Sequence, residues 1–513
     1  MPSRALRLSL ALACLVFTLS SCRLFQSNQI IVPEGSSAKL VKKAQIYATP
    51  FTISKNALYT ASTDDSNVVH INSYSDSLQL IANIPTEYRL KKREYIIKNL
   101  MRNNELAIIT RKNTDDSASF WGVSIDIQTG KVKQRKKLWE KSKIGVASNY
   151  LLGISLSVGN SNTLADMNLQ DNLDAYFSPD SSKIFFKKYG INSDGSPEAI
   201  VRVFDKEFNL LREEKIFYSK RAADGISSIF VDNDGVIYVA GTKLEQTGNT
   251  IFVEKLPQSI LDREILSADF TEKPRDLTLD LQEYSTKLVE LEKDRFLVVS
   301  LGTEFKESNG PLLGLASCVF DFKNKKVLQK FYEVDEVKSR ELGDARFINY
   351  LHLKNVSRDG EGNYFALCET IFKKITTSSR GASSEVTING DLFAFGFSND
   401  IKPIWQKKLK RTLIQRAEQP MMEALAPEPQ IVVQSQGDKA TIMYPNAELG
   451  YDYLVLNFKT GKIGKSGVLL KTTGLASINS IEDAVWNGST FWLSGGEGMG
   501  LDAARIFGVT FVE

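Results

Sequence analysis

The sequence predicts an all-β protein, a β-propeller of about eight four-stranded blades, with seven as the alternative count. Three observations support this prediction. Hairpins of alternating apolar and polar residues recur along the chain, tight polar turns separate their strands, and few segments show a helical pattern. A small four-stranded sheet cannot bury both of its faces alone. The repeat therefore favours radial stacking of the units around a common centre.

One hairpin of each unit is the easiest to recognise. Alternating apolar residues run into Asp, Asn or Ser, then into a turn rich in Lys, Gly and Asn, and then into a short second strand. Alternation is typical of half-buried strands, and these turn residues accept positive φ. Copies of this hairpin begin at Val123, Val201, Cys318, Phe393 and Leu454.

A second type of hairpin precedes the first in each unit and gives the count of eight. Its copies span residues 51–62, 97–110, 175–188, 226–241, 287–301, 352–369, 432–445 and 481–495. The last unit ends with residues 504–513, a third strand with no fourth after it. We therefore expect residues 40–48 to supply the missing strand and to close the ring by pairing with the C-terminal strand. A pair of smaller β-domains and an open β-solenoid are the alternatives.

Three stretches interrupt the repeat, and they are the expected functional surface because long loops on rigid scaffolds often carry binding residues. Residues 138–173 have only weak strand signals. Residues 372–389 are rich in Ser, Thr and Gly and predict a long hairpin loop. Residues 417–429 predict one short helix between units.

The N-terminus has the pattern of an export signal. Arg4 and Arg7 precede a nearly apolar stretch, Leu8–Leu19, which is shorter than the ~20 residues that a helix needs to cross a bilayer. The Leu-Ser-Ser-Cys sequence that follows, ending at Cys22, resembles the lipobox of bacterial lipoproteins. The alternative is an ordinary secretory signal in which Cys22 has no role.

The lipoprotein resemblance implies cleavage between Ser21 and Cys22, and acylation of the Cys22 thiol, which would anchor the protein to a membrane. Residues 1–21 are then the signal peptide, residues 22–39 a lipidated tether, and residues 40–513 the propeller domain. In Gram-negative lipoproteins, Asp directly after the lipidated cysteine retains the protein in the inner membrane. This chain has Arg23 there, which favours the outer membrane if the organism has a Gram-negative envelope.

Charge excludes one broad class of partner. Removal of residues 1–21 takes two of the 64 basic residues and none of the 61 acidic ones, so the mature chain has a net charge of +1. Nucleic-acid-binding proteins usually show a strong basic bias, so we expect no nucleic-acid partner. The basic runs at residues 131–143 and 402–411 are expected to be solvated strand ends, with contacts to anionic lipid or polysaccharide as the alternative.

Histidine and cysteine are too scarce for a metal or disulfide framework. His70 and His352 are the only histidines and lie in different units, so we expect no metal site and find no support for a histidine base. Cys318 and Cys368 lie inside apolar strands. We expect both to be buried as small hydrophobic residues, with a single disulfide between neighbouring units as the alternative.

Short turn motifs resemble those of known propeller repeats. Residues 178–186 (SPDSSKIFF) are similar to the Ser-Pro-Asp-Gly turn, with Ser181 where Gly is usual. DIQTGKV and NFKTGKI resemble the Asp-x-x-Thr-Gly-Lys turn of quinoprotein-like propellers, whose blade-locking tryptophans are matched best by Trp139 and Trp405. With its signal region, the whole chain resembles the poorly characterised propeller lipoproteins of Gram-negative envelopes. Eight-bladed lipoproteins of this kind include the scaffold subunit of the outer-membrane β-barrel assembly machine.

The sequence contains no nucleophile elbow, P-loop or HExxH motif. The Gly-rich segments at 192–195, 232–235, 358–362 and 495–500 are expected to be hairpin turns or loops rather than calcium or phosphate sites. We therefore expect a membrane-anchored envelope lipoprotein whose propeller is a non-catalytic binding or scaffold domain for a protein or glycan partner, without a cofactor.

Two other functions remain open. The first is a hydrolase or lyase that acts on carbohydrate or peptide through carboxylates in the propeller funnel. A cluster of carboxylates with shifted pKa values would favour this alternative. The second is a quinone- or metal-dependent oxidoreductase.

Overall fold

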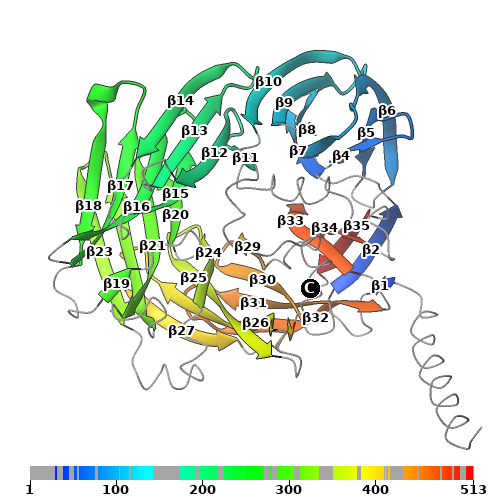
Figure 1. Cartoon of the computed structure of the whole chain (residues 1–513). Helices are drawn as coiled ribbons and strands as arrows, with labels where there is room; N and C mark the ends of the chain where they lie inside the picture. Colours follow the sequence, from blue (N-terminus) through cyan, green and yellow to red (C-terminus); the bar gives the residue numbers. More distant parts are fainter. Residues whose placement is uncertain are drawn as a thin grey trace, which may run out of the picture.

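The computed structural model contains eight antiparallel β-sheets arranged around a common centre, and this confirms the predicted all-β propeller architecture (Figure 1). Five sheets have four strands and three have five. Within residues 29–511 the structure describes all but the following segments: 32–37, 46–50, 55–56, 76–78, 103, 115–116, 143–173, 192–196, 218–224, 246–247, 271–276, 280–285, 305–311, 334–350, 378–382, 410, 412–413, 416–430, 447–449, 474–476, 488–489 and 497–503.

Sheets 1 to 4 follow one another along the chain. Sheet 1 is β3 (Phe51–Ser54), β4 (Ala57–Thr63), β5 (Val68–Tyr74) and β6 (Leu80–Arg89). Sheet 2 is β7 (Glu94–Arg102), β8 (Glu105–Asn113), β9 (Ser117–Asp126) and β10 (Val132–Ser142). Sheet 3 is β11 (Asp174–Phe177), β12 (Ile184–Ile191), β13 (Pro197–Phe204) and β14 (Leu210–Phe217). Sheet 4 is β15 (Gly225–Val231), β16 (Ile237–Glu245), β17 (Gly248–Leu256) and β18 (Glu264–Asp269), with a short 3-10 helix, η3 (Ile260–Asp262), before β18.

Sheets 5 to 8 include the added strands. Sheet 5 is β19 (Leu277–Leu279), β20 (Thr286–Glu292), β21 (Arg295–Glu304), β22 (Leu312–Asp321) and β23 (Lys326–Glu333). Sheet 6 is β24 (Leu351–Arg358), β25 (Tyr364–Thr377), β26 (Ser383–Phe397), β27 (Pro403–Leu409) and β28 (Ile414–Gln415). Sheet 7 is β29 (Val432–Gln436), β30 (Lys439–Pro445), β31 (Tyr451–Asn457), β32 (Ile463–Thr473) and β1 (Gln29–Ile31). Sheet 8 is β33 (Ser477–Asn487), β34 (Thr490–Gly496), β35 (Ala504–Phe511) and β2 (Ala38–Gln45).

The two ends of the described chain meet in sheet 8. β2 pairs antiparallel with β35, with Leu40 opposite Val509 and Lys39 opposite Thr510. The strand missing from the last unit was predicted at residues 40–48, and this pairing confirms it for residues 40–45, whereas residues 46–48 lie outside the described residues. A second N-terminal strand, β1, lies along β32, with Ile30 opposite Thr472. Part of the segment expected to be a tether is therefore paired with sheet 7.

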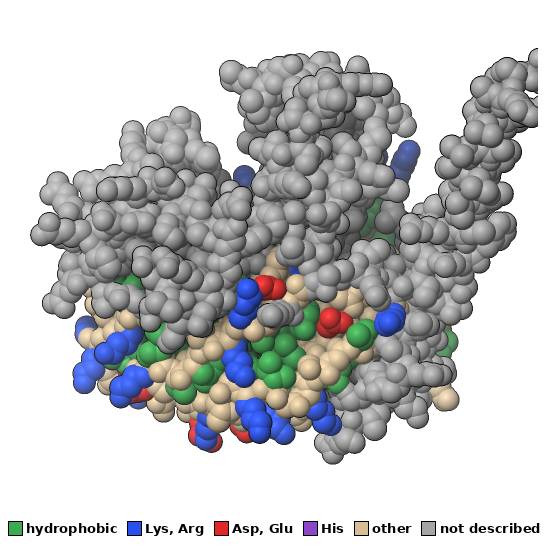
Figure 2. Space-filling view, turned by 90° about the horizontal axis from the view of Figure 1, so that it is seen from below, with side chains coloured by type: hydrophobic (Ala, Val, Ile, Leu, Met, Phe, Trp, Pro, Cys, Tyr) green, Lys and Arg blue, Asp and Glu red, His purple; other side chains and the backbone are tan. Residues whose placement is uncertain are grey.

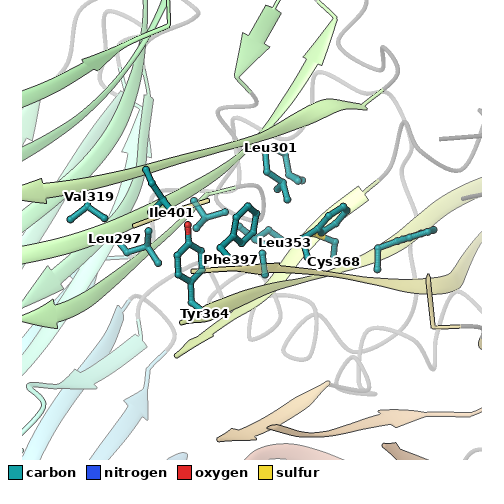
Figure 3. Close-up of a cluster of buried hydrophobic side chains, with 13 residues drawn as sticks. Leu297, Leu301, Val319, Leu353, Tyr364, Cys368, Phe397 and Ile401 are labelled. Atoms are coloured by element: carbon teal, nitrogen blue, oxygen red, sulfur yellow. The ribbon is translucent and has the colours of Figure 1, made fainter. Parts of the chain in front are cut away.

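Hydrophobic side chains fill the seams between neighbouring sheets. In the seam between sheets 5 and 6, Leu297 and Val319 of one sheet pack near Leu353, Tyr364 and other residues of the next (Figure 3). Equivalent apolar clusters lie between the other neighbouring sheets from sheet 1 to sheet 7. This arrangement follows from the alternation in the sequence, because each face of a strand contributes to a different seam.

The two cysteines lie in neighbouring seams and do not form a disulfide. Cys318 belongs to the cluster between sheets 4 and 5, and Cys368 belongs to the cluster between sheets 5 and 6. Burial raises the pKa of both thiols. The prediction of two buried small hydrophobic residues is confirmed.

The turn motifs adopt the geometry that their sequences predict. Asp126 accepts hydrogen bonds from the backbone N–H groups of Gln128 and Thr129, and Gly130 has φ of 69°. The Asn457 turn repeats this pattern in sheet 7. Ser181, which replaces the usual glycine, has φ of 59°.

Trp405 links sheets 6 and 7. Its Nε1 donates a hydrogen bond of 2.7 Å to the carbonyl of Phe458. A Cβ on Gly396 or on Gly461 would come within 2.1 or 2.5 Å of the indole, so both positions must be glycine for the ring to fit. Trp139 in turn lies under the guanidinium of Arg202 in sheet 3, 4.2 Å from the ring centre.

One expectation about the interruptions of the repeat differs from the structure, and two others lie outside the described residues. Residues 372–389 were expected to be a long hairpin loop, but β25 and β26 continue through most of this range, and Ile371 pairs with Asn389. The Ser and Thr residues of this range are therefore compatible with an extended hairpin. The expected helix at residues 417–429 and the weak strand near residues 151–158 lie outside the described residues.

The basic runs are only partly the solvated strand ends that were expected. Lys133 and Lys402 are exposed, and Figure 2 shows Lys and Arg side chains among hydrophobic and uncharged ones on one side of the array. Arg135, in contrast, lies over the ring of Trp121 at 4.2 Å, and the Arg411 side chain is completely buried. The part of the chain that the structure describes contains no helix with the length and hydropathy of a membrane span.

Candidate functional site

The candidate site lies in the seam between sheets 4 and 5, at the ends of their first strands. The turn after β15 supplies Asp232, and the turn after β20 supplies Asp294. Glu290 of β20 pairs in register with Phe296, whose ring packs against Tyr238 of sheet 4. Because residues paired in register project to the same face of a sheet, Glu290 also faces sheet 4. Three carboxylates from two sheets therefore meet at one end of this seam.

Hydrogen bonds organise two of these three carboxylates. The hydroxyl of Tyr238 donates to Asp294 at 2.6 Å and lies 3.5 Å from an oxygen of Asp232. The ammonium of Lys255 forms an ion pair with Asp294. Asp232 also accepts two backbone N–H groups of its own turn, from Asp234 at 2.9 Å and Val236 at 2.8 Å. Among the described residues, Glu290 has no hydrogen-bond or ion-pair partner.

These surroundings shift the pKa values of the three carboxyl groups in different directions. Burial raises the pKa of Asp232, and the neighbouring Asp234 and Asp294 raise it further. Burial, followed by the charges of Asp232 and Asp294, also raises the pKa of Glu290. Burial alone would raise the pKa of Asp294, but Lys255 and Tyr238 outweigh it and lower this pKa.

The arrangement can support general acid–base chemistry. Neighbouring carboxyl groups whose environments push their pKa values apart can take the roles of acid and base at the same pH. Glu290 is the group best placed to hold a proton, because no cation among the described residues pairs with it. Asp294 is the group best placed to stay ionised, because Lys255 and the Tyr238 hydroxyl both stabilise its negative charge.

A metal ion is not required to explain the cluster. Among the residues that the structure describes, no three His, Cys, Asp or Glu side chains are arranged closely enough to hold a metal ion. The segment 232–235 was expected to be a turn rather than a calcium loop, and its hydrogen bonds and the φ of 82° at Gly235 confirm a turn.

The residues singled out from the sequence lie apart from this cluster. Ser21 and Cys22 lie outside the described residues. His70 contacts Asn83 and Asp64 in sheet 1, and His352 lies in β24 of sheet 6. From the sequence, we interpreted Asp232 only as a turn residue and did not identify Glu290 as a candidate. Alternation could have placed Glu290 on a seam face, but nothing in a single sequence shows which carboxylates of neighbouring sheets meet.

Comparison with known proteins gives distant structural matches and no sequence match. No protein-family model and no curated protein sequence matches the chain. Among solved structures, a prolyl endopeptidase aligns over 90% of this chain and 55% of its own, with 10% identity and a TM-score of 0.40. The polysaccharide lyase Uly1 aligns over 81% of this chain and 89% of its own, with 10% identity and a TM-score of 0.40. The β-propeller domain of the Trilobed protease from Pyrococcus furiosus aligns over 81% and 95%, with 12% identity and a TM-score of 0.36.

These comparisons correct the expectation of a non-catalytic binding or scaffold domain. That expectation rested on the predicted anchor, the repeat and the lack of a familiar catalytic motif, whereas the solved structures to which this chain is similar include peptidases and a polysaccharide lyase. The absence of such a motif is therefore no ground for excluding catalysis. The likeness concerns the fold, and this chain spans about half the length of the prolyl endopeptidase, so no residue role is transferred from it.

Proposed function

We propose that this chain is a hydrolase or lyase of carbohydrate or peptide polymers, and that it acts at the cluster of Asp232, Glu290 and Asp294. Cleavage of glycosidic bonds fits the cluster best, because that reaction is commonly carried out by two carboxyl groups, one protonated and one ionised. The observation that carries the proposal is Glu290, a partly buried carboxyl group that has two carboxylate neighbours and, in the part of the chain that the structure describes, no paired cation.

In this proposal, Glu290 is the general acid. Its proton passes to the leaving-group oxygen as the glycosidic bond breaks, and the carboxylate of Glu290 then accepts a proton from the attacking water. Asp294 remains ionised beside Lys255 and stabilises the positive charge that develops on the sugar ring. The Tyr238 hydroxyl donates to Asp294 and lies 3.5 Å from an oxygen of Asp232, so it connects these two carboxyl groups.

The test is a substrate panel applied to the purified chain. Neutral polysaccharides, acidic polysaccharides and polypeptides are incubated separately, and new reducing ends, new carbon–carbon double bonds and new amines are measured. Double bonds identify a lyase, and reducing ends without double bonds identify a glycoside hydrolase. Glu290→Gln should lower kcat by about 100-fold or more, because it removes the proton donor.

Glu292→Gln is the matched control. Glu292 lies on the same strand, is exposed and forms an ion pair of 2.9 Å with Arg295, so its loss should leave kcat unchanged. Absence of cleavage for all three substrate classes would contradict the proposal, as would a Glu290→Gln variant with wild-type activity.

The lipid anchor is a separate proposal. It is supported by the lipobox-like sequence ending at Cys22, and Arg23 favours the outer membrane. The full chain expressed in a Gram-negative host should incorporate labelled fatty acid. Cys22→Ser should abolish this labelling, whereas Cys318→Ser should retain it. Normal labelling of the Cys22→Ser variant would refute the anchor.

A further inference from the structure

The outermost strands of sheets 5, 6 and 7 form one continuous edge of the propeller. The Tyr332 hydroxyl of β23 donates a hydrogen bond of 3.0 Å to the side chain of Gln406 in β27. Trp405 of β27 donates in turn to the Phe458 carbonyl of sheet 7. In Figure 1, β27 and β32 lie on the lower side of the molecule, and Figure 2 shows this side, with Lys and Arg side chains spread among hydrophobic ones.

This edge is rich in lysine. We define the lysine edge as residues 323–330, 402–408 and 459–467, which contain ten lysines and no Asp or Glu. Four of these lysines form ion pairs with carboxylates beside the edge, namely Lys325 with Glu264, Lys402 with Asp400, Lys408 with Asp391, and Lys459 with Glu361. The other six form no ion pair in the part of the chain that the structure describes: Lys323, Lys326, Lys330, Lys407, Lys462 and Lys465.

Carboxylates in neighbouring turns do not balance this charge. Asp321, Asp359 and Asp438 adjoin the lysine edge, and together with the four paired carboxylates they make seven against ten lysines. Of the six unpaired lysines, five are exposed and Lys407 is half-buried. The excess positive charge therefore lies at the surface, where it attracts anions from solution without any buried site.

The outermost strands elsewhere in the ring have a different charge pattern. β10 of sheet 2 is also rich in Lys and Arg, but Lys133 pairs with Glu105 and Lys137 pairs with Glu140. In sheets 3 and 4, β14 and β18 together contain four acidic and two basic residues. Unpaired lysine on outermost strands is thus concentrated on one side of the ring.

Two large aliphatic side chains are exposed among these lysines. Leu328 is 41% exposed and Ile404 is 45% exposed. Leu328 lies between Lys326 and Lys330 at alternate positions of β23, so these three side chains project to the same face. An anionic membrane accepts both kinds of side chain, because its headgroups attract ammonium groups and its interface takes up aliphatic ones. A soluble polyanion would use the lysines alone.

The N-terminal strand lies on the same side of the ring. β1 pairs with the end of β32, with Gln29 opposite Thr473. Gln29 follows Cys22 by seven residues, and seven residues span at most about 25 Å. Lipid on Cys22 would therefore keep the membrane within about 25 Å of this end of β32.

We propose that the lysine edge rests on the anionic surface of a membrane. The membrane then lies against the circumference of the ring, and both faces of the propeller, including the one with the turns of Asp232 and Asp294, remain open to solvent. This inference extends the proposed lipid anchor, but the charge pattern that supports it does not depend on the anchor. It is independent of the proposed catalytic activity.

Cosedimentation of the full chain with vesicles tests the inference. All proteins carry Cys22→Ser, so that acylation makes no contribution, and the apolar stretch Leu8–Leu19 contributes equally to each of them. Vesicles of phosphatidylcholine alone measure that common contribution. Vesicles that also contain phosphatidylglycerol should bind the chain at least about 10-fold more strongly, and added salt should reduce the difference.

Neutralising the lysine edge should remove this preference. The combined change of Lys326, Lys330, Lys462 and Lys465 to Gln should lower binding to the anionic vesicles at least about 10-fold and leave binding to neutral vesicles unchanged. The matched control changes four other exposed lysines without ion pairs to Gln, namely Lys91, Lys92, Lys131 and Lys215. It removes the same charge from sheets 1 to 3 and should lower binding less than about 3-fold. Equal losses in the two variants, or equal binding of the starting protein to both kinds of vesicle, would overturn the inference. Binding to polygalacturonate but not to anionic vesicles would also overturn it, and would assign the lysine edge to acidic polysaccharide.

The orientation on the membrane gives a second test that leaves every lysine of the lysine edge in place. Chain that has been shown to carry fatty acid is reconstituted into anionic vesicles with brominated lipids, which quench nearby fluorophores. A fluorophore on Ser466→Cys, an exposed position of β32, should be quenched. A fluorophore on Lys131→Cys, an exposed position of sheet 2 across the ring, should not be quenched. Equal fluorescence at the two positions would refute the orientation, whereas loss of fatty-acid labelling would refute only the anchor.

Discussion

Glu290 and Glu292 lie two residues apart on β20 but in different surroundings. Glu290 faces the seam and two other carboxylates, whereas the Glu292 side chain is 63% exposed and contacts Arg295. The register of β20 against β21 shifts between these two residues. A comparison of the two glutamates therefore separates the effect of the seam from the effect of removing one negative charge.

The raised pKa of Glu290 predicts how its removal changes stability with pH. The folded state holds the Glu290 proton more tightly than the unfolded state, so ionisation destabilises the fold as pH rises above 4.5, the ordinary pKa of a glutamate. Glu290→Gln mimics the protonated form. It should raise the unfolding midpoint at pH 7 by about 1–2 °C and leave it unchanged at pH 4, as measured by circular dichroism.

Glu292→Gln should show no such pH-dependent gain, because Glu292 is exposed and paired. A Glu290→Gln variant that is less stable than the wild type at pH 7 would contradict the prediction, since it would mean that the ionised carboxylate is favourable in the fold. A stabilising but inactivating substitution at this position would match the trade-off between stability and activity that is common at catalytic sites.

Trp405 should make a measurable contribution to the contact between sheets 6 and 7. Trp405→Phe loses the 2.7 Å hydrogen bond to Phe458 and should destabilise the protein by about 1 kcal/mol. Trp405→Ala also loses the packing against Gly396 and Gly461 and should cost about 2–4 kcal/mol. Urea unfolding of both variants measures these differences. If Trp405→Ala is no less stable than Trp405→Phe, the packing contributes nothing.

At the scale of single elements, the turns show how local sequence determines local structure. Asp126 and Asn457 begin turns with the same Thr-Gly-Lys sequence, and both accept hydrogen bonds from the N–H groups two and three residues later. In both turns the glycine has positive φ. These interactions lie within five residues of chain, and for this reason the hairpins could be predicted from the sequence.

Ser181 tests the same relation where the sequence departs from the usual glycine. At a φ of 59°, a non-glycine residue destabilises the folded state by roughly 1 kcal/mol. Glycine avoids this strain, but its greater freedom in the unfolded chain offsets part of the gain in stability. Ser181→Gly should therefore stabilise the protein by about 0.5 kcal/mol in urea unfolding. Ser182→Gly, at a position without positive φ, should destabilise it. The reverse order of the two variants would show that backbone strain at Ser181 is not significant.

Contacts between residues far apart in the sequence were less predictable than contacts within a turn. Alternation along β27 puts Arg411 on the same face as Leu409, so a buried position could have been inferred, but the run of lysines before it indicated a solvated strand end. The partner Glu369 lies 42 residues away in another strand. The Glu290 cluster depends in the same way on two turns from different sheets, and no spacing within one sequence specifies that meeting.

At the scale of the whole molecule, the pairing of β2 with β35 joins the two ends of a chain of eight sheets. The remaining three strands of sheet 8 come from the last unit of the sequence, and only the fourth comes from the N-terminal region. An incomplete last unit at the C-terminus and an unassigned strand at the N-terminus were together sufficient to predict this pairing. Apolar clusters join each of sheets 1 to 7 to its neighbours, and we expect the stability of the last sheet to depend on this exchange of strands.

The register of this pairing can be tested by a covalent link. Lys39 lies opposite Thr510, and directly opposed residues of antiparallel strands have Cα atoms about 4.5–5.5 Å apart, within the range that a disulfide spans. Lys39→Cys combined with Thr510→Cys should form a disulfide under oxidising conditions, seen as faster migration on a non-reducing gel. Cys318 and Cys368 are buried and should not interfere.

In the control, Lys39→Cys is combined with Arg505→Cys. Arg505 lies opposite Gln45, six residues along β2, so no disulfide should form. The correct link closes a loop of nearly the whole chain and should raise the unfolding midpoint, because it restricts the unfolded state strongly. Equal cross-linking of both cysteine pairs, or of neither pair, would contradict the register and with it the joining of the two chain ends in sheet 8.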